Sequence, residues 1–217
     1  MKAYIFDLDG TLLDSLDVWL NIDIDFLKKR GLAVPPDFPD AVSSMSFPEA
    51  AAYTIKRFSL SDTADSLMQE WNDMAISAYE NTVLMKPYAK EYLFALRDRG
   101  VKLAIATSST PDLYEPALRN HGVYDLFDVI CNSQEVDCGK TRPDIFFLTA
   151  KKLGVQPQDC IVFEDIIAAV KSAKNAGMKV CGVYDERSKN DWEEIKKIAD
   201  FAILSFQNAP LAISLKS

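Results

Sequence analysis

The sequence has little histidine and no closely spaced cysteine pair, and these absences argue against several kinds of active site. Its 217 residues include one histidine, His121, and four cysteines without Cys-x-x-Cys spacing. A multi-histidine metal site or a Ser-His-Asp triad is therefore not expected. His121 precedes a glycine at an expected helix end, which indicates a capping or solvated role. Cys131, Cys160 and Cys181 lie in or beside apolar runs, which predicts free, buried thiols in a reducing, cytoplasmic compartment.

Basic residues and long apolar runs are also scarce. The chain has 24 Lys and Arg against 32 Asp and Glu, a formal net charge of −8. This balance argues against general binding to nucleic acid or to an anionic membrane, but a local cation can still attract a small phosphorylated substrate. No window approaches the length of a membrane span, and no leader-like apolar run begins the chain. We expect a small-molecule partner, and a monomer or weak homo-oligomer.

The most informative stretch is the first apolar run and the turn that follows it. Residues 3–6 are four apolar residues in a row, which predicts a strand buried on both faces. Asp7 and Asp9 follow it, and Gly10 then opens the backbone. Carboxylates at the rim of a buried strand are costly unless a cation or a reaction uses them. An ordinary Asx-type turn is the alternative that this stretch alone leaves open.

The rest of the chain divides into a helical stretch and an alternating one. Residues from about 15 to 84 contain nothing that alternates like a strand. Helices are expected there at 50–58 and 64–79, the second capped by Ser61 or Asp62. After Pro87, apolar strands alternate with helices of about ten residues, which is typical of a doubly wound parallel sheet. Its further strands are expected at 101–106, 129–131, 160–163, 179–183 and 201–204. We predict an α/β core domain (1–14 and 85–217) with an inserted α-helical cap domain (15–84).

Polar side chains follow successive strands of the predicted sheet. In chain order they are Asp7, Asp9, Thr107, Ser108, Lys140, Glu164 and Asp165. Right-handed crossovers bring the carboxyl ends of all parallel strands to one edge, where ligands bind. Several carboxylates without histidine suit a hard cation, Mg²⁺ above all. A hydroxyl and a lysine suit phosphoryl oxygens, one Asp can attack phosphorus, and another can transfer protons. Taken singly, these hydroxyls and carboxylates also fit helix caps, and the lysine a solvated position.

The motifs formed by these residues resemble those of the haloacid dehalogenase-like hydrolase superfamily, in its subgroup with a helical cap. The first motif is the stretch Asp7-Leu8-Asp9-Gly10-Thr11-Leu12, and the second is Ala106-Thr107-Ser108. The third covers residues 139–146, and the fourth is Val162-Phe163-Glu164-Asp165. The resemblance covers essentially the whole chain and implies a Rossmann-like core with an inserted cap. Within the superfamily, the phosphatases and β-phosphoglucomutases look nearest.

The resemblance also implies a role for each site residue. Asp7 looks like the nucleophile that forms an aspartyl-phosphate, and Asp9 like the general acid and base. Thr107 looks like the phosphate-binding hydroxyl, beside the backbone of Ser108. Lys140 looks like the cation that holds both the phosphoryl group and the nucleophile.

The implied cofactor is Mg²⁺. Its expected ligands are the side chains of Asp7 and Asp165 and the main-chain carbonyl of Asp9, with Glu164 as a supporting acid. The sequence departs from the family pattern at Thr141, where a proline is usual, and at Ile166 and Ala169, where serine and glycine are common. These departures affect the surroundings of the metal and the packing of a helix rather than the central chemistry.

Three functions remain open from the sequence. Asp9 favours phosphoryl transfer over dehalogenation, because a phosphate ester's leaving group needs a proton. A β-phosphoglucomutase-like mutase is the alternative to a phosphatase. Mutases of this type carry a histidine near Trp19 and an arginine near Phe47, and this chain has neither. Lys56 and Arg57 are the candidates for a second phosphate, but adjacent helix positions do not share a face.

We therefore predict a Mg²⁺-dependent phosphatase that acts on a small phosphorylated metabolite. Trp19 and Phe47 would line an aromatic recess for the substrate, although packing inside the cap explains them equally well. A non-catalytic phospho-acceptor domain is a third possibility, disfavoured by the order of the acidic motifs and by the inserted cap.

Overall fold

The computed structural model describes residues 1–43 and 45–211, which form two compact units. The core unit contains residues 1–16 and the described residues from Val83 on. The helical unit contains residues 17–82. Each unit is built around its own apolar interior, and each is described separately below.

A six-stranded sheet forms the centre of the core unit. Its strands are β1 (Ala3–Phe6), β4 (Lys102–Thr107), β5 (Val129–Asn132), β6 (Cys160–Glu164), β7 (Lys179–Val183) and β8 (Phe201–Ile203). They run parallel in the order β5-β4-β1-β6-β7-β8. The predicted doubly wound parallel sheet is confirmed. The order reverses at β1 and β6, because the chain builds outward from β1 to β5 and then returns to the other side of β1.

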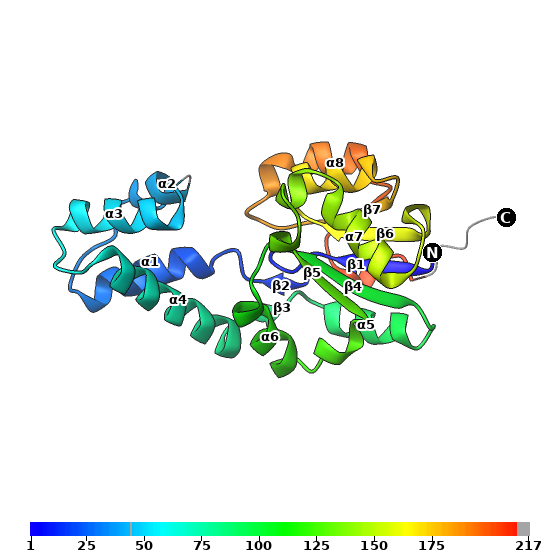
Figure 1. Cartoon of the computed structure of the whole chain (residues 1–217), viewed down its shortest axis with the longest axis horizontal. Helices are drawn as coiled ribbons and strands as arrows, with labels where there is room; N and C mark the ends of the chain where they lie inside the picture. Colours follow the sequence, from blue (N-terminus) through cyan, green and yellow to red (C-terminus); the bar gives the residue numbers. More distant parts are fainter. Residues whose placement is uncertain (44, 212–217) are drawn as a thin grey trace. The chain divides into compact units, whose positions relative to one another are not determined.

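Helices cover both faces of this sheet (Figure 1). They are α5 (Ala89–Arg97), α6 (Pro111–Asn120), α7 (Asp144–Leu153), α8 (Ile167–Asn175) and α9 (Trp192–Ile198). In Figure 1, α7 and α8 lie on one side of the sheet, and α5 and α6 lie on the other. Short 3₁₀ turns complete the connections, at Tyr124–Leu126, Ser133–Glu135, Gly139–Thr141, Pro157–Asp159, Lys189–Asp191 and Phe206–Asn208. His121 is the C-cap of α6, which confirms its expected place at a helix end.

The two faces of β1 bury different side chains, because successive residues of a strand point to opposite faces. Ala3 and Ile5 belong to the core cluster that contains the inner faces of α7 and α8. Phe6 faces the other way and stacks on Phe163 of β6, with ring centroids 4.7 Å apart. Tyr92 of α5 packs against both rings. The expected buried thiols are confirmed as well: Cys131, Cys160 and Cys181 are free and buried.

A short antiparallel pair of strands links the segment in which the chain leaves the core unit to the segment in which it returns. Its strands are β2 (Leu13–Asp14) and β3 (Leu84–Met85). The backbone N–H of Lys86 extends the pairing by donating to the carbonyl oxygen of Leu12 at 2.8 Å. The sequence did not predict this pair, because strands of two residues are too short to show an alternating pattern.

The described residues of the helical unit form four helices: α1 (Val18–Lys29), α2 (Phe38–Ser43), α3 (Phe47–Phe58) and α4 (Ala64–Asn81). The helix α3 begins three residues earlier than predicted, because Ser46 and Glu49 form a capping box. The prediction that Ser61 or Asp62 caps α4 is wrong. Thr63 is the cap, and its side chain accepts from the Ser66 N–H at 3.2 Å. Asp62 instead accepts a hydrogen bond from Arg30.

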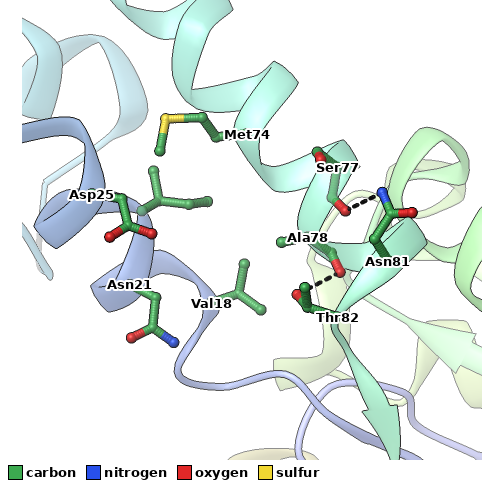
Figure 2. A pocket seen from close by; sticks show the side chains of 9 residues that line it. Val18, Asn21, Asp25, Met74, Ser77, Ala78, Asn81 and Thr82 are labelled. Carbon is green, nitrogen blue, oxygen red and sulfur yellow. Dashed lines mark hydrogen bonds between the residues drawn. The ribbon is translucent and has the colours of Figure 1, made fainter. Parts of the chain in front are cut away.

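A cavity of about 460 Å³ lies between α1 and α4 (Figure 2). Its apolar lining includes Val18 and Ile22 from α1, and its polar lining includes Asn21, Asp25 and Ser77. Figure 2 shows Asn21 and Asp25 on α1 across from the Met74 and Ser77 side chains of α4. None of its nine lining residues is Lys or Arg, so this cavity supplies no cation for a phosphate.

We expect Glu70→Gln to destabilise the helical unit at neutral pH and to have a smaller effect in acid. Hydrogen bonds from Arg30 lower the pKa of Glu70 from 4.5 to about 2. A carboxylate whose pKa falls on folding stabilises the protein above its unfolded pKa, and that contribution fades as the pH falls towards the folded pKa. Because solvent partly screens this pair, the loss at pH 7 should be about 1–2 kcal/mol. Urea unfolding at pH 7 and pH 3 measures it, and an equal loss at both would contradict the assignment.

Candidate active site

The centre of the site lies where the strand order reverses. Asp7 directly follows β1, and Glu164 is the last residue of β6, the strand paired with β1 in parallel register. The Asp7 N–H donates to the carbonyl oxygen of Phe163 at 3.0 Å, which continues the ladder by one step. The backbone therefore places these two carboxylates side by side at the carboxyl edge of the sheet.

Lys140 joins the two carboxylates. It lies in the 3₁₀ turn Gly139–Thr141, in the connection between β5 and α7. Its Nζ donates to Asp7 Oδ1 at 2.5 Å and to Glu164 Oε1 at 2.5 Å. All three side chains are at most 10% exposed. The other oxygen of Glu164, Oε2, accepts from the backbone N–H groups of Asp165 and Ile166. Glu164 is thus held rigidly, and Lys140 bridges it to Asp7.

Asp165 is fully buried, and each of its two carboxylate oxygens accepts a hydrogen bond from a hydroxyl group. Thr11 Oγ1 donates to Oδ1 at 2.8 Å, and Ser188 Oγ donates to Oδ2 at 3.0 Å. Gly10 approaches so closely that a Cβ there would lie 2.5 Å from Asp165 Oδ2, and its φ is +84°. A side chain at residue 10 would therefore both strain the backbone and displace Asp165.

Asp9 is half-buried in the turn after β1. Ser15 Oγ donates to Asp9 Oδ1 at 2.6 Å. The same turn is closed by the Leu13 N–H, which donates to the carbonyl oxygen of Leu8 at 2.8 Å. Asp9 therefore has an oriented carboxyl group two residues from Asp7.

Thr107 ends β4, the neighbour of β1 on the side away from β6. The prediction placed Thr107 after the strand, whereas it is the last strand residue and is paired with Asn132. Its side chain is fully buried, and its Oγ1 accepts from the Ser109 N–H at 2.9 Å. Ser108, between them, is exposed. Both residues thus lie at the carboxyl edge that carries Asp7.

Trp19 and Phe47, the residues predicted to line a substrate recess, belong to the helical unit. Trp19 lies on α1 and packs edge-to-face on Phe47, with ring centroids 5.7 Å apart. Phe47 in turn contacts Trp71 of α4, at 5.6 Å between ring centroids. Trp19 and Phe47 remain 42% and 39% exposed. Internal packing therefore covers only part of each of these two rings.

Burial and repulsion from neighbouring carboxylates raise the pKa values of two carboxyl groups of the core cluster, those of Asp7 and Asp165. Burial raises the pKa of Asp7 well above its usual range, although Lys140 partly opposes this. Burial and the neighbouring Glu164 raise the pKa of Asp165 to about 7. Burial alone would lower the pKa of Lys140, but Asp7 and Glu164 outweigh it and hold that pKa above its usual value. The cluster is short of positive charge.

A hard divalent cation would supply the positive charge that this cluster of carboxylates lacks. Asp7, Glu164 and Asp165 offer carboxylate oxygens that lie within 4.8 Å of one another. Lys140 is the one cation that contacts Asp7 and Glu164 in the described part of the chain. Oxygen donors without histidine or thiolate are the set that Mg²⁺ prefers. The residues present therefore fit a magnesium ion, with Asp7, Glu164 and Asp165 as the side chains that would hold it.

The sequence profile of the haloacid dehalogenase-like hydrolases matches residues 1–177 of the chain. The protein belongs to this family. The prediction of a haloacid dehalogenase-like enzyme in the phosphatase and β-phosphoglucomutase-like group is confirmed. Among the described residues of this hydrolase, no helix has the length and apolar character that a membrane span requires.

Three similar proteins illustrate the range of the family. A Drosophila melanogaster protein named "Probable pseudouridine-5'-phosphatase" is 30% identical over 214 residues, covering 91% of this chain and 90% of that protein. Hexitol phosphatase A of Escherichia coli K12 is 31% identical over 186 residues, covering 84% and 82%. A Thermotoga maritima structure provisionally described as a β-phosphoglucomutase superposes with a TM-score of 0.82 at 24% identity, covering 94% of both chains. That structural likeness concerns the fold.

Three hydroxyl groups of this hydrolase's site were missed by the sequence reasoning. Thr11 and Ser15 lie within and just after the first motif, so their closeness to Asp9 in the sequence was an available signal. Ser188 lies 23 residues beyond Asp165, in a stretch with no recognisable pattern. Only the parallel pairing of β6 with β7 brings its loop to Asp165.

Proposed function

We propose that the protein is a Mg²⁺-dependent phosphatase that hydrolyses a small phosphorylated metabolite through an aspartyl-phosphate on Asp7. The observation that carries the proposal is the contact of one buried ammonium group, that of Lys140, with both Asp7 and Glu164. A lysine held there can neutralise a phosphoryl oxygen next to the attacking carboxylate. The core unit would then carry the chemistry, and the helical unit would act as a cap domain that selects the substrate.

The reaction requires two steps at Asp7. In the first, a carboxylate oxygen of Asp7 attacks phosphorus, the bond from phosphorus to the ester oxygen breaks, and Asp9 gives its proton to the leaving oxygen. In the second, Asp9 takes a proton from water, the water oxygen attacks phosphorus, and the bond to Asp7 breaks. Inorganic phosphate leaves, and both aspartates return to their starting states.

The surrounding residues hold the phosphoryl group during both steps. Thr107 and the backbone N–H of Ser108 would hydrogen-bond its oxygens, and Lys140 would balance its charge. A bound Mg²⁺, held by Asp7, Glu164, Asp165 and the Asp9 carbonyl, would supply further stabilisation of negative charge.

The charge of the helical unit favours a phosphatase over a mutase, which must bind a second phosphate in the cap. Residues 17–82 contain eleven carboxylates and five basic side chains. Three of these basic side chains already have acidic partners: Lys29 and Arg30 contact Glu70, and Arg57 donates to both oxygens of Asp37 at 2.9 Å. The unit therefore repels a second phosphate more than it attracts one.

The half-exposed rings of Trp19 and Phe47 support a substrate whose part beyond the phosphate is uncharged. An apolar, aromatic face binds a sugar ring or a base by its flat, less polar side. Trp19 would then line the recess for the leaving group.

Hydrolysis of p-nitrophenyl phosphate tests the proposal, with Mg²⁺ and with EDTA. We expect turnover only with Mg²⁺, followed by activity in a screen of sugar phosphates, nucleotides and phosphoglycolate. Interconversion of β-glucose 1-phosphate and glucose 6-phosphate, with the bisphosphate present, would instead establish a mutase. A stable phosphate on Asp7 without turnover would contradict hydrolysis and establish a phospho-acceptor.

Asp9→Asn should slow both chemical steps, because the amide cannot transfer a proton. The expected loss in kcat is about 10²–10⁴-fold, the usual contribution of a general acid and base. The substitution keeps the size of the side chain and its contact with Ser15. Steady-state kinetics with a poor and a good leaving group measure the effect, and the poor leaving group should suffer more. A loss in kcat much smaller than about 10²-fold with both substrates would reassign Asp9 to a structural role.

A further inference from the structure

The loop that follows β7 reaches the metal-binding edge of the core unit. Ser188 Oγ in this loop donates to Asp165 Oδ2 at 3.0 Å. Asp165 itself is fully buried, and its other oxygen accepts from Thr11. Each oxygen therefore has one hydroxyl donor, and a carboxylate oxygen has lone pairs left for a cation beside such a donor. Ser188 and Thr11 together leave the Asp165 carboxyl group little freedom to rotate.

A buried ion pair holds this loop in place. Lys86 donates to Asp185, the first loop residue after Tyr184, and the two side chains are 14% and 5% exposed. The second oxygen of Asp185 accepts from the Arg187 N–H at 2.8 Å, and the Asp185 carbonyl accepts from the Ser188 N–H at 3.2 Å. Lys86 follows β3 directly, and its own N–H is fixed by Leu12. The ion pair thus sets the path of the backbone on which Ser188 stands.

We propose that Ser188 is a positioning residue for Asp165, and that the Lys86–Asp185 ion pair holds Ser188 in place. This inference rests on the proposed function, since it concerns the affinity of the core unit for Mg²⁺. Hydrogen bonds that orient a metal-binding carboxylate raise its affinity, because the ligand is already in place when the metal arrives. The next residue, Ile166, offers no hydroxyl from the chain beside Asp165, so the donor comes from a loop 23 residues further on.

A calorimetric titration of the full chain with MgCl₂, after removal of divalent ions with EDTA, tests the proposal. Ser188→Ala should raise the Kd for Mg²⁺ by about 10–100-fold, the usual effect of losing a group that orients a ligand. Ser188→Thr keeps the hydroxyl and should restore most of the affinity. In turnover assays, Ser188→Ala should raise the Mg²⁺ concentration that gives half-maximal activity.

Asp185→Asn tests the second half of the proposal. It should weaken Mg²⁺ binding in the same direction as Ser188→Ala. The variant that combines Asp185→Asn with Ser188→Ala should bind Mg²⁺ no more weakly than the weaker-binding single variant, because both changes act through one loop and their effects are not additive. If Asp185→Asn does not fold, the pair of Ser188 variants decides the role of Ser188. Lys86→Gln, which removes the charge from the other side of the ion pair, then replaces Asp185→Asn and should weaken Mg²⁺ binding in the same direction.

Ser172→Ala is the matched control. Ser172 lies on α8 of the core unit, is buried, and its Oγ has no hydrogen-bond partner. The Ser172→Ala variant should bind Mg²⁺ with the affinity of the wild type. Equal Mg²⁺ affinity in wild type, Ser188→Ala and Ser172→Ala would overturn the inference and leave the proposed function intact. A wild-type chain that binds no Mg²⁺ would overturn the proposed function itself.

Discussion

Asp7→Asn should abolish phosphate hydrolysis and leave the fold intact. An amide oxygen is too weak a nucleophile to attack phosphorus, so we expect kcat to fall by about 10⁴-fold or more. The variant should fold, because Lys140 keeps its contact with Glu164 and a buried carboxyl group whose pKa is already raised is replaced by a neutral group of the same shape. Kinetics on p-nitrophenyl phosphate and a thermal melt measure the two effects.

Asp159→Asn is the control for this prediction. Asp159 is also buried in the core unit, but it precedes β6 and pairs with Lys2 at 2.8 Å, at the opposite end of the strand. Its variant should hydrolyse phosphate as the wild type does. Appreciable Mg²⁺-dependent activity in Asp7→Asn would show that another group attacks phosphorus. Incubation with substrate should also label the wild type, but not Asp7→Asn, with an acid-stable, hydroxylamine-labile phosphate.

Lys140→Met should damage both stability and activity. Removing the lysine leaves Asp7, Glu164 and Asp165 close together without their cation. Breaking a buried ion pair on one side costs about 3–5 kcal/mol, and the loss of a positive group at a transferring phosphoryl lowers kcat by about 10³–10⁵-fold. Urea unfolding in EDTA and steady-state kinetics with Mg²⁺ measure these losses. Mg²⁺ should recover part of the stability, because it restores positive charge among the carboxylates.

Lys152→Met separates this effect from the loss of any lysine. Lys152 pairs with Glu135 at 2.5 Å, but both side chains are 39% exposed. Exposed pairs contribute about 0–1 kcal/mol, so this variant should remain close to the wild type in unfolding and in turnover. Stability losses of equal size in the two variants would mean that Lys140 is an ordinary surface lysine and that its bridge between Asp7 and Glu164 has no special role.

Much of the core unit and its catalytic edge could be predicted from the sequence. Apolar runs that alternate with helices of ordinary length specify a parallel sheet, because strands buried on both faces need continuous apolar residues. The rule that parallel strands end at one edge then places Asp7, Thr107 and Glu164 together. Predictions that rested on local sequence signals, such as helix caps, were less accurate. The helix α4 is capped by Thr63 rather than by Ser61 or Asp62, because Asp62 accepts from Arg30, a partner remote in the chain.

Long-range contacts decided the rest. The sequence by itself determined the fold class, the family, the acidic and basic residues at the edge, and Thr107 and Ser108, since each follows a recognisable strand or motif. It did not show that Lys140 bridges two carboxylates, or that Ser188 meets Asp165, or that Lys86 pairs with Asp185. These pairs lie 23 to 133 residues apart, and they carry no periodicity or spacing that marks them. Their geometry exists only once neighbouring strands pair and the loops after them converge.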